Sequence, residues 1–273
     1  MKIIKRLIYT VFFVILLFSG CVTNPLSGKK TMALIGNNEI LAMSFSEYDT
    51  FLKENTVIRG TAEAEMVNRL GSRIAQAAQK WLERENALHY LDGYKWEFNL
   101  VKDDAINAWC MPGGKIVVYT GILPITQTEE GLAVVMGHEV AHALLNHGQQ
   151  RMSAGLLQQL GAVGVAILVS GSSQESQALI MTAYGVGTTV FGTLPFSREH
   201  ESEADHYGLI LSSIAGYNPD AAVPFWQRMA SLGGGKTPEF LSTHPSDTTR
   251  IRNLAALTPE AKRVAATFGV EFK

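Results

Sequence analysis

The sequence predicts a mainly helical α+β fold with one small β-sheet. Apolar residues between Met66 and Trp81 recur every three or four positions, which is the spacing of one buried helix face. In 96–101 and 115–121 the period changes to two, and this alternation is typical of β-strands. The two stretches flank the turn Pro112-Gly113-Gly114, so we expect a hairpin or a small sheet there.

Helix ends are predicted from capping residues, because Ser, Thr, Asn and Asp accept hydrogen bonds from the first free backbone N–H groups of a helix. Candidate caps stand at Asn38, Thr61, Thr126, Asn218 and Ser246. The helix that Asn38 would cap should run to about Asn55. Thr126 with Glu129 has the capping-box spacing, so we expect a helix to start there and to carry the histidines that follow.

The first residues have the composition of a targeting signal. Basic residues precede an apolar run that ends at Phe18, and small residues stand directly before Cys21. The stretch "LFSGC" resembles the lipobox of bacterial lipoproteins, in which the cysteine is lipidated and becomes the mature N-terminus. An ordinary cleaved signal or a single N-terminal anchor is the alternative interpretation.

We therefore divide the chain into a signal peptide at 1–20, a lipidated Cys21 with a tether at 21–36, and one folded domain at 37–273. Asn-Pro and Ser-Gly turn signals after Cys21 suit a tether. Lipidation would leave Cys110 without a disulfide partner, and we expect Cys110 to be a small buried hydrophobic residue.

The charge balance argues against nucleic acid as a partner. The whole chain has a net charge of −2, and the basic residues before the apolar run lie outside the expected domain, which is more acidic still.

Residues 152–197 form an apolar, glycine-rich segment whose one formal charge is Glu175. Each half is about long enough to cross a bilayer. A glutamine pair interrupts the first half, however, and no basic flank marks the central turn. We expect a helical hairpin packed on the protein, with insertion in a membrane as the alternative.

The stretch "GHEVAHALLNHG", residues 137–148, holds three of the seven histidines. His138 and His142 are four positions apart, so on a helix both imidazoles leave the same face and can bind one cation. Neutral imidazole suits zinc, and a catalytic zinc site takes three protein ligands. Glu139, next to the first ligand, is placed to accept a proton from a water at that site.

The third ligand must come from another part of the chain. On one continuous helix His147 would point away from the ligand face, so we interpret it as a structural or solvated residue. The polar segment 197–208 offers carboxylates instead. Glu201 and Asp205 share a helix face, so one could bind zinc while the other orients a ligand histidine. Spacing alone does not choose between Glu201 and Glu203.

Four motifs together resemble one protein family. In chain order they are "NAWCMPGGKIVVYTGIL", "HEVAH", "SREHESEAD" and "STHPSDTTRI". They are similar to motifs of the zinc metallopeptidase family that includes the CAAX prenyl proteases, HtpX and the mitochondrial Oma protease, in particular to its soluble bacterial lipoprotein branch. The resemblance covers about residues 60–257 and implies a zincin-like fold of the gluzincin type with one zinc per chain. It selects Glu201 as the third ligand and implies that Asp205 is the carboxylate behind a ligand histidine.

The resemblance also implies roles for residues outside the zinc helix. The segment with Asn107 and Ala108 would supply a sheet edge to which an extended substrate could add as a strand. Cys110 stands where the family usually has an aliphatic or aromatic residue. His244 resembles a loop histidine of the lipoprotein branch, and it could be a fourth, inhibitory zinc ligand or a hydrogen-bond donor to the oxyanion. A structural histidine before Pro245 is the alternative.

These observations predict a zinc metalloendopeptidase of the bacterial cell envelope, held by the lipid on Cys21 at the periplasmic face of the outer membrane. Its ligands would be His138, His142 and Glu201, with Glu139 as the base. The resemblance implies misfolded or misassembled envelope proteins as substrates, and envelope assembly or chaperone proteins as partners. The alternative is a zinc-stabilised, chaperone-like binding lipoprotein with little proteolytic turnover.

Overall fold

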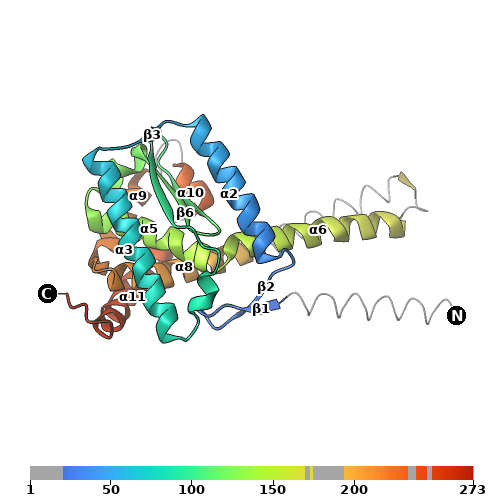
Figure 1. Cartoon of the computed structure of the whole chain (residues 1–273). Coiled ribbons are helices and arrows are strands. Elements are labelled where there is room, and N and C mark those ends of the chain that lie inside the picture. The colour runs from blue at the N-terminus through green and yellow to red at the C-terminus, as the bar shows by residue number, and fades with distance from the viewer. Residues whose placement is uncertain (1–20, 170–172, 175–193, 233–237, 245–247, 273) are drawn as a thin grey trace.

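The structure, a computed structural model, describes residues 21–169, 173–174, 194–232, 238–244 and 248–272. Helices pack on both faces of a four-stranded sheet (Figure 1), which confirms the expected α+β class. The expected signal peptide at 1–20 and the expected cap at Ser246 lie outside the described residues.

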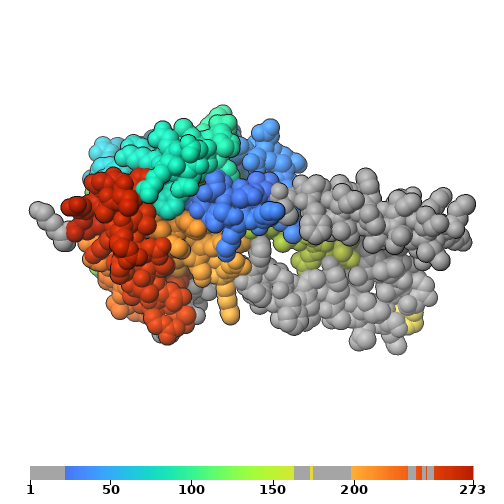
Figure 2. Space-filling model, turned by 90° about the horizontal axis from the view of Figure 1, so that it is seen from below, coloured from blue at the N-terminus to red at the C-terminus, as the bar shows by residue number. Residues whose placement is uncertain are grey.

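The segment that was expected to be a tether is folded against the domain. Strands β1 (Cys21–Thr23) and β2 (Lys30–Met32) pair as an antiparallel ribbon. Between them, Asn24 is 1% exposed and its Nδ2 donates to the carbonyl of Leu144 at 2.8 Å, and Leu26 is part of the main core. The ribbon also lies against the later helix α8, as the blue and orange surfaces in Figure 2 show.

Helix α2 (Asn37–Glu54) begins one residue before the expected cap. Its N-cap is Gly36, with extended backbone and no side-chain hydrogen bond, so the prediction of Asn38 as the cap was wrong. The predicted length was nearly correct, because the helix ends directly before Asn55.

Helix α3 (Ala62–Arg84) follows its sequence signals. The Thr61 hydroxyl accepts a hydrogen bond from the backbone N–H of Ala64 at 3.2 Å, as a capping threonine should. Leu70 and Ile74, in the middle of the predicted apolar stripe, are fully buried in the main core. The short 3-10 helix η1 (Leu88–Leu91) then leads to the sheet.

The sheet has the strand order β3-β4-β6-β5. Its strands are β3 (Val57–Ile58), β4 (Glu97–Val101), β5 (Ala108–Met111) and β6 (Lys115–Tyr119). The hairpin lies between β5 and β6, whereas β4 and β6, which correspond to the two predicted alternating stretches, are parallel neighbours. Gly113 and Gly114 in the hairpin turn both have a φ of 83°, which favours glycine.

The two faces of the sheet contact different helices, as the alternation of apolar residues requires. Leu100 and Ile116 face the main core, which lies between the sheet and the helices α3 and α5. Val101 and Val117, one position further along, pack with Tyr48 of α2 on the other face. Strand β5 has a neighbour on one side only and is therefore an edge of the sheet.

Helix α5 (Glu129–Leu144) contains the histidine motif, as predicted, but its cap is Thr128. The Thr128 hydroxyl accepts a hydrogen bond from the N–H of Gly131 at 3.0 Å. Thr126 instead ends the short helix α4 (Leu123–Thr126), which follows the 3-10 turn η2 (Thr120–Ile122). The capping-box prediction was wrong by two residues because Gln127, with a φ of 63°, separates the two helices.

Helix α5 crosses helix α8 (Leu194–Ile214) at unusually close range. A Cβ built on Gly137 would lie 2.5 Å from the carbonyl oxygen of Gly208, and one on Gly208 would lie 2.7 Å from the N of His138. Two glycines are therefore required at the crossing. The close approach brings the polar faces of the two helices together directly beside His138.

Helix α6 (His147–Val169) begins beside the site and runs away from the sheet (Figure 1). It is the first half of the segment expected to form an apolar hairpin, and most of the second half falls outside the described residues. Among the helices that the structure describes, none has the length and apolarity needed to span a bilayer.

The C-terminal part covers α5 and α8. After Asn218, whose side chain caps a 3-10 turn as predicted, the elements are η4 (Pro219–Ala221), α9 (Ala222–Ser231), α10 (Glu239–Thr243) and α11 (Thr248–Ala266). Helix α11 packs against α8 and α9.

Candidate metal centre and catalytic cleft

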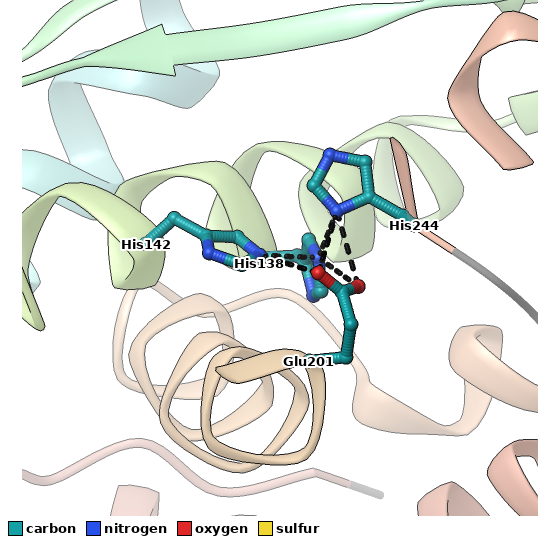
Figure 3. Close-up of side chains that lie close together, drawn as sticks. All are labelled: His138, His142, Glu201 and His244. Atoms are coloured by element: carbon teal, nitrogen blue, oxygen red, sulfur yellow. Dashed lines mark hydrogen bonds and ion pairs between the residues drawn. The ribbon is translucent and has the colours of Figure 1, made fainter. Parts of the chain in front are cut away.

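Four buried side chains from three parts of the chain converge on one point. His138 and His142 come from α5, Glu201 from α8, and His244 from the end of α10 (Figure 3). One donor atom from each lies within 4.8 Å of all the others. The structure thus brings together the three predicted ligands and the predicted loop histidine.

The distances between these donors fit a small cation. Nε2 of His138 lies 3.0 Å from Nε2 of His142 and 3.2 Å from Nδ1 of His244. Oxygens of Glu201 lie 3.3 Å from each of the two motif histidines. In a tetrahedral zinc site with bonds of about 2.0–2.1 Å, neighbouring donors are about 3.3 Å apart. Two facing imidazole lone pairs would also repel each other, and a bound cation removes that repulsion.

The charges of the cluster favour a cation as well. Burial alone would lower the pKa of His138, but hydrogen bonds with Asp205 and Glu201 outweigh it and raise the pKa to about 9. Burial would raise the pKa of Glu201, yet hydrogen bonds with the histidines hold it far below its usual range. Burial lowers the pKa of His142 well below its usual value, and the positive charge of His138 lowers it further. The carboxylates therefore stabilise positive charge at this point, while Glu201 and His142 have the protonation states that a metal requires.

Glu139 lies beside the donors. It is 3% exposed, and Oε1 has no hydrogen-bond donor among the described residues, although Nε2 of His244 approaches it to 3.4 Å. Burial raises the pKa of the Glu139 carboxyl, and the charge of His244 opposes that rise only in part. An unsatisfied carboxylate oxygen with a raised pKa is suited to take a proton from a water molecule.

Asp205 lies behind His138, on the side away from the other donors. Its Oδ1 is 3.0 Å from Nδ1 of His138, so it can accept the proton of that nitrogen. Arg250 of α11 binds the same carboxylate with both Nε and Nη2, at 2.8 and 2.7 Å. Burial would raise the pKa of Asp205, but the charge of Arg250 keeps it lowered and the carboxylate ionised.

Arg250 was not identified from the sequence, although it lies in the motif "STHPSDTTRI". It is 7% exposed, stacks on the ring of Trp226 at 3.6 Å, and donates from Nη1 to the carbonyl of His244 at 3.3 Å. The available signal was the position of Arg250 on the same helix face as the apolar residues Leu254 and Ala261, because an arginine on such a face is buried only when it is paired.

The prediction for His147 was wrong in its direction. Helix α5 ends at Leu144, Asn146 takes a φ of 56°, and His147 starts a new helix. The change of direction places Nδ1 of His147 at 2.9 Å from Nδ1 of His142. Asn146 was the available signal, since asparagine is one of the few residues that adopt positive φ. The structural part of the prediction agrees with the burial of His147, which is 1% exposed.

The choice between the two glutamates of α8 follows from their side-chain directions. Glu201 points into the donor cluster, whereas Glu203 contacts Nε2 of His147 at 3.1 Å and pairs with Lys29 at 2.6 Å. This agrees with the assignment of Glu201 from the resemblance.

His244 is held in place by the short helix that precedes it. It is the C-cap of α10, its ring packs on Phe240 at 4.7 Å, and Nδ1 lies 3.0 Å from both oxygens of Glu201. Glu239 of the same helix accepts a hydrogen bond from Asn107 at 3.0 Å, which ties α10 to the start of β5.

A cleft of about 340 Å³ opens between the edge strand β5 and the site. The strand side is formed by Asn107, Ala108, Trp109 and Cys110, and the site side by Glu139, His142 and His244. Cys110 is half-buried rather than fully buried, and burial raises the pKa of its thiol well above the usual value. It therefore lines the cleft as a neutral thiol.

Residues 64–258 match the sequence model of peptidase family M48. The mitochondrial metalloendopeptidase OMA1 of Saccharomyces cerevisiae is 36% identical over 200 residues, which are 70% of this chain and 55% of that protein. Metalloprotease YcaL of Escherichia coli is 26% identical over 220 residues, 80% of this chain and 84% of YcaL. The beta-barrel assembly-enhancing protease of Escherichia coli is 30% identical over 164 residues, 57% of this chain and 33% of that protein. The chain thus spans about half the length of the OMA1 relative.

Proposed function

Because the chain belongs to peptidase family M48, whose members depend on zinc, we propose that it is a zinc-dependent endopeptidase. The observation that carries the proposal is the convergence of four buried donors beside Glu139, whose oxygen has no donor among the described residues, at the floor of a cleft. Zinc also explains why three imidazoles and two carboxylates are buried within contact distance of one another.

In the proposed site His138, His142 and Glu201 hold the metal. When bound, zinc would polarise the scissile carbonyl and lower the pKa of a water molecule. Glu139 accepts the proton of this water and returns it to the leaving amine. Asp205 holds the proton on Nδ1 of His138, which leaves the lone pair of Nε2 directed at the metal.

The substrate in this proposal adds to the sheet as an extra strand. Strand β5 is an edge of the sheet, and Asn107 and Ala108 line the same cleft as Glu139. An extended peptide beside β5 would form backbone hydrogen bonds along this edge and pass over the donors. This mode reads backbone rather than side chains, so it suits unfolded segments of many sequences.

We propose that His244 inhibits the enzyme when no substrate is bound, because it occupies the position of a fourth ligand. Its Nδ1 lies among the donors, at 3.2 Å from Nε2 of His138, which is the position of a fourth ligand. A substrate would therefore have to displace it. The expected result is that His244→Ala cleaves faster than the wild type with the same zinc content. A loss of activity at unchanged zinc content would instead favour the oxyanion role.

The central test is the hydrolysis of casein, a loosely folded protein, by wild type and by Glu139→Gln, each checked for bound zinc. Glu139→Gln keeps the shape of the side chain but cannot accept the proton, so we expect zinc binding with at least a 100-fold loss of rate, on the order of a lost general base. Equal rates for the two proteins would refute the proposal.

We also propose a cellular location and a class of substrates for this protein. The lipobox-like sequence before Cys21 supports a lipid anchor in a bacterial cell envelope, at the periplasmic face of the outer membrane. The relatives in Escherichia coli, one of them named for the assembly of beta-barrels, support misfolded or misassembled envelope proteins as substrates, with envelope assembly or chaperone proteins as partners.

Radiolabelled palmitate tests the anchor. The wild-type chain should incorporate the label in a bacterial host and fractionate with membranes, and Cys21→Ser should do neither. Labelling of Cys21→Ser would contradict lipidation at this cysteine.

A binding protein with little turnover is the second candidate, and the position of His244 favours it. If wild type, Glu139→Gln and His244→Ala all bind zinc and capture unfolded protein without cleaving it, this candidate replaces the peptidase.

A further inference from the structure

The two motif histidines differ in what supports their outer nitrogens. Nδ1 of His138 faces a carboxylate directly, whereas Nδ1 of His142 faces the imidazole of His147 at 2.9 Å. The rings of His142 and His147 are nearly perpendicular, at 73°, with centroids 4.9 Å apart. Such an edge contact directs a ring nitrogen of one residue at the other.

His147 is itself held from two further sides. Its Nε2 lies 3.1 Å from Oε2 of Glu203, and its ring stacks on His200 at 4.0 Å with an angle of 13° between the planes. Glu203 pairs with Lys29 of the N-terminal ribbon. The contact with Glu203 therefore fixes the direction of the ring nitrogens of His147, and the stacking on His200 fixes the orientation of the ring plane.

The proton positions follow from this geometry. Nε2 of His142 faces the donor cluster and needs its lone pair there, so its proton lies on Nδ1. That N–H donates to Nδ1 of His147, whose own proton then lies on Nε2 and is donated to Glu203. Each nitrogen and the carboxylate thus have one defined role in a chain of two hydrogen bonds.

We propose that His147 is a positioning residue for the metal site, which with Glu203 holds the ring and the tautomer of the ligand His142. The proposal rests on the proposed zinc site. A carboxylate behind a ligand histidine raises the basicity of that ligand and fixes its direction. Here the carboxylate acts through a second imidazole, because Glu203 is one ring too far away to reach His142 itself.

The proposal is tested by the zinc affinity of the whole chain, which is measured by competition with a chromophoric chelator. His147→Leu keeps most of the volume and removes both nitrogens. His147→Asn keeps an acceptor near the Nδ1 position but does not reach Glu203. Loss of the support for a ligand histidine typically weakens metal binding by about 10–100-fold, which is the effect expected for His147→Leu, with a smaller effect for His147→Asn.

His206, which lies on α8, supplies the matched control for His147. His206 also contacts a glutamate, Glu260, at 3.2 Å, but this pair lies at the surface away from the donors. His206→Leu should therefore leave zinc affinity unchanged. If His147→Leu does not fold, Glu203→Gln takes its place, because it removes the charge at the end of the chain, and weaker zinc binding is again expected.

Cobalt(II) provides a readout that a merely structural role would not change. Its visible absorption depends on the geometry of its ligands, so the spectrum of a cobalt-loaded His147 variant should differ from that of the wild type. Wild-type affinity and a wild-type cobalt spectrum in His147→Leu and Glu203→Gln would overturn the proposal for His147. Failure of the wild type itself to bind zinc would overturn the proposed function instead.

Discussion

His138 and His142 are one helical turn apart on α5, yet their outer nitrogens have different surroundings. Behind His138, Asp205 and Arg250 form a bidentate ion pair that is buried under Trp226. The side chains of this inner support come from α8, α9 and α11, and each is at most 8% exposed. The inner support consists of full charges that are removed from water and depend on each other.

Behind His142 the support leads outward to the surface. His147 is buried, Glu203 is partly exposed, and Lys29 has 54% of its side chain exposed. The outer support therefore starts with neutral rings and ends in solvent. Two ligands from one motif are therefore coupled to different parts of the molecule, His138 to the buried core and His142 to the N-terminal ribbon.

The largest effect is expected from Asp205→Asn, which breaks the inner support. Asparagine cannot hold the proton on His138 as a carboxylate does, and Arg250 is left buried without its counter-ion. We expect zinc affinity to fall about 100-fold and the free energy of unfolding to fall by about 3 kcal/mol. Chelator competition and urea unfolding measure the two quantities.

Asp220→Asn is the matched control, because Asp220 pairs with Lys262 at the surface. It should behave like the wild type. An Asp205→Asn protein with wild-type stability would show that the buried pair is not coupled to folding.

The next effect is expected from Arg250→Met, which removes the other half of the same pair. Asp205 can still accept the proton of His138, so zinc affinity should fall less than in Asp205→Asn. The buried carboxylate without its partner should still cost about 3 kcal/mol of stability. Urea unfolding of Arg250→Met and of the exposed neighbour variant Arg252→Met checks this, and equal losses in both would contradict it.

The free energy of unfolding should depend on pH because His147 and His200, the buried rings of the outer support, are neutral in the folded protein. Burial lowers the pKa of His147, and that of His200 to about 3, from an unfolded value near 6.5. Below pH 6.5 the unfolded chain binds protons that the folded state does not, so stability falls as pH falls. In metal-free protein His200→Phe should reduce the slope between pH 6.5 and 5 by about 1 kcal/mol per pH unit. An unchanged slope in chemical unfolding would contradict the assignment.

The smallest effect is expected from Lys29→Met, at the exposed end of the outer support. Ion pairs in solvent contribute about 0–1 kcal/mol, so both stability and zinc affinity should stay close to those of the wild type. A tenfold loss of zinc affinity in Lys29→Met would show that the ribbon is coupled to the metal more strongly than its exposure suggests.

Local patterns in the sequence predicted the parts of the fold that depend on neighbours in the chain. Thr61 caps α3 and Asn218 caps the turn before α9, and the spacing of His138 and His142 places both on one face of α5. Capping and helix periodicity involve residues within about four positions, so a single sequence contains all the information.

Other predictions failed where a residue one or two positions away changed the backbone. Gln127 separates Thr126 from α5, and Asn146 turns His147 toward His142. The order of the strands was also not predicted. Strand β4 pairs in parallel with β6, although β5 lies between them in the chain. Pairing between distant strands depends on packing against the helices rather than on either strand's own pattern.

Candidate metal ligands could be identified from helix geometry alone, because the H-E-x-x-H spacing places His138 and His142 on one helix face and Glu201 and Asp205 are an i, i+4 pair. Which other side chains join the two histidines depends on the packing of helices that are far apart in the chain. In the packed structure Glu201 points into the donor cluster whereas Glu203 contacts His147, and the end of α10 places His244 among the donors. Contacts between side chains far apart in the chain depend on how closely helices approach, and this is decided by the packing of the whole core.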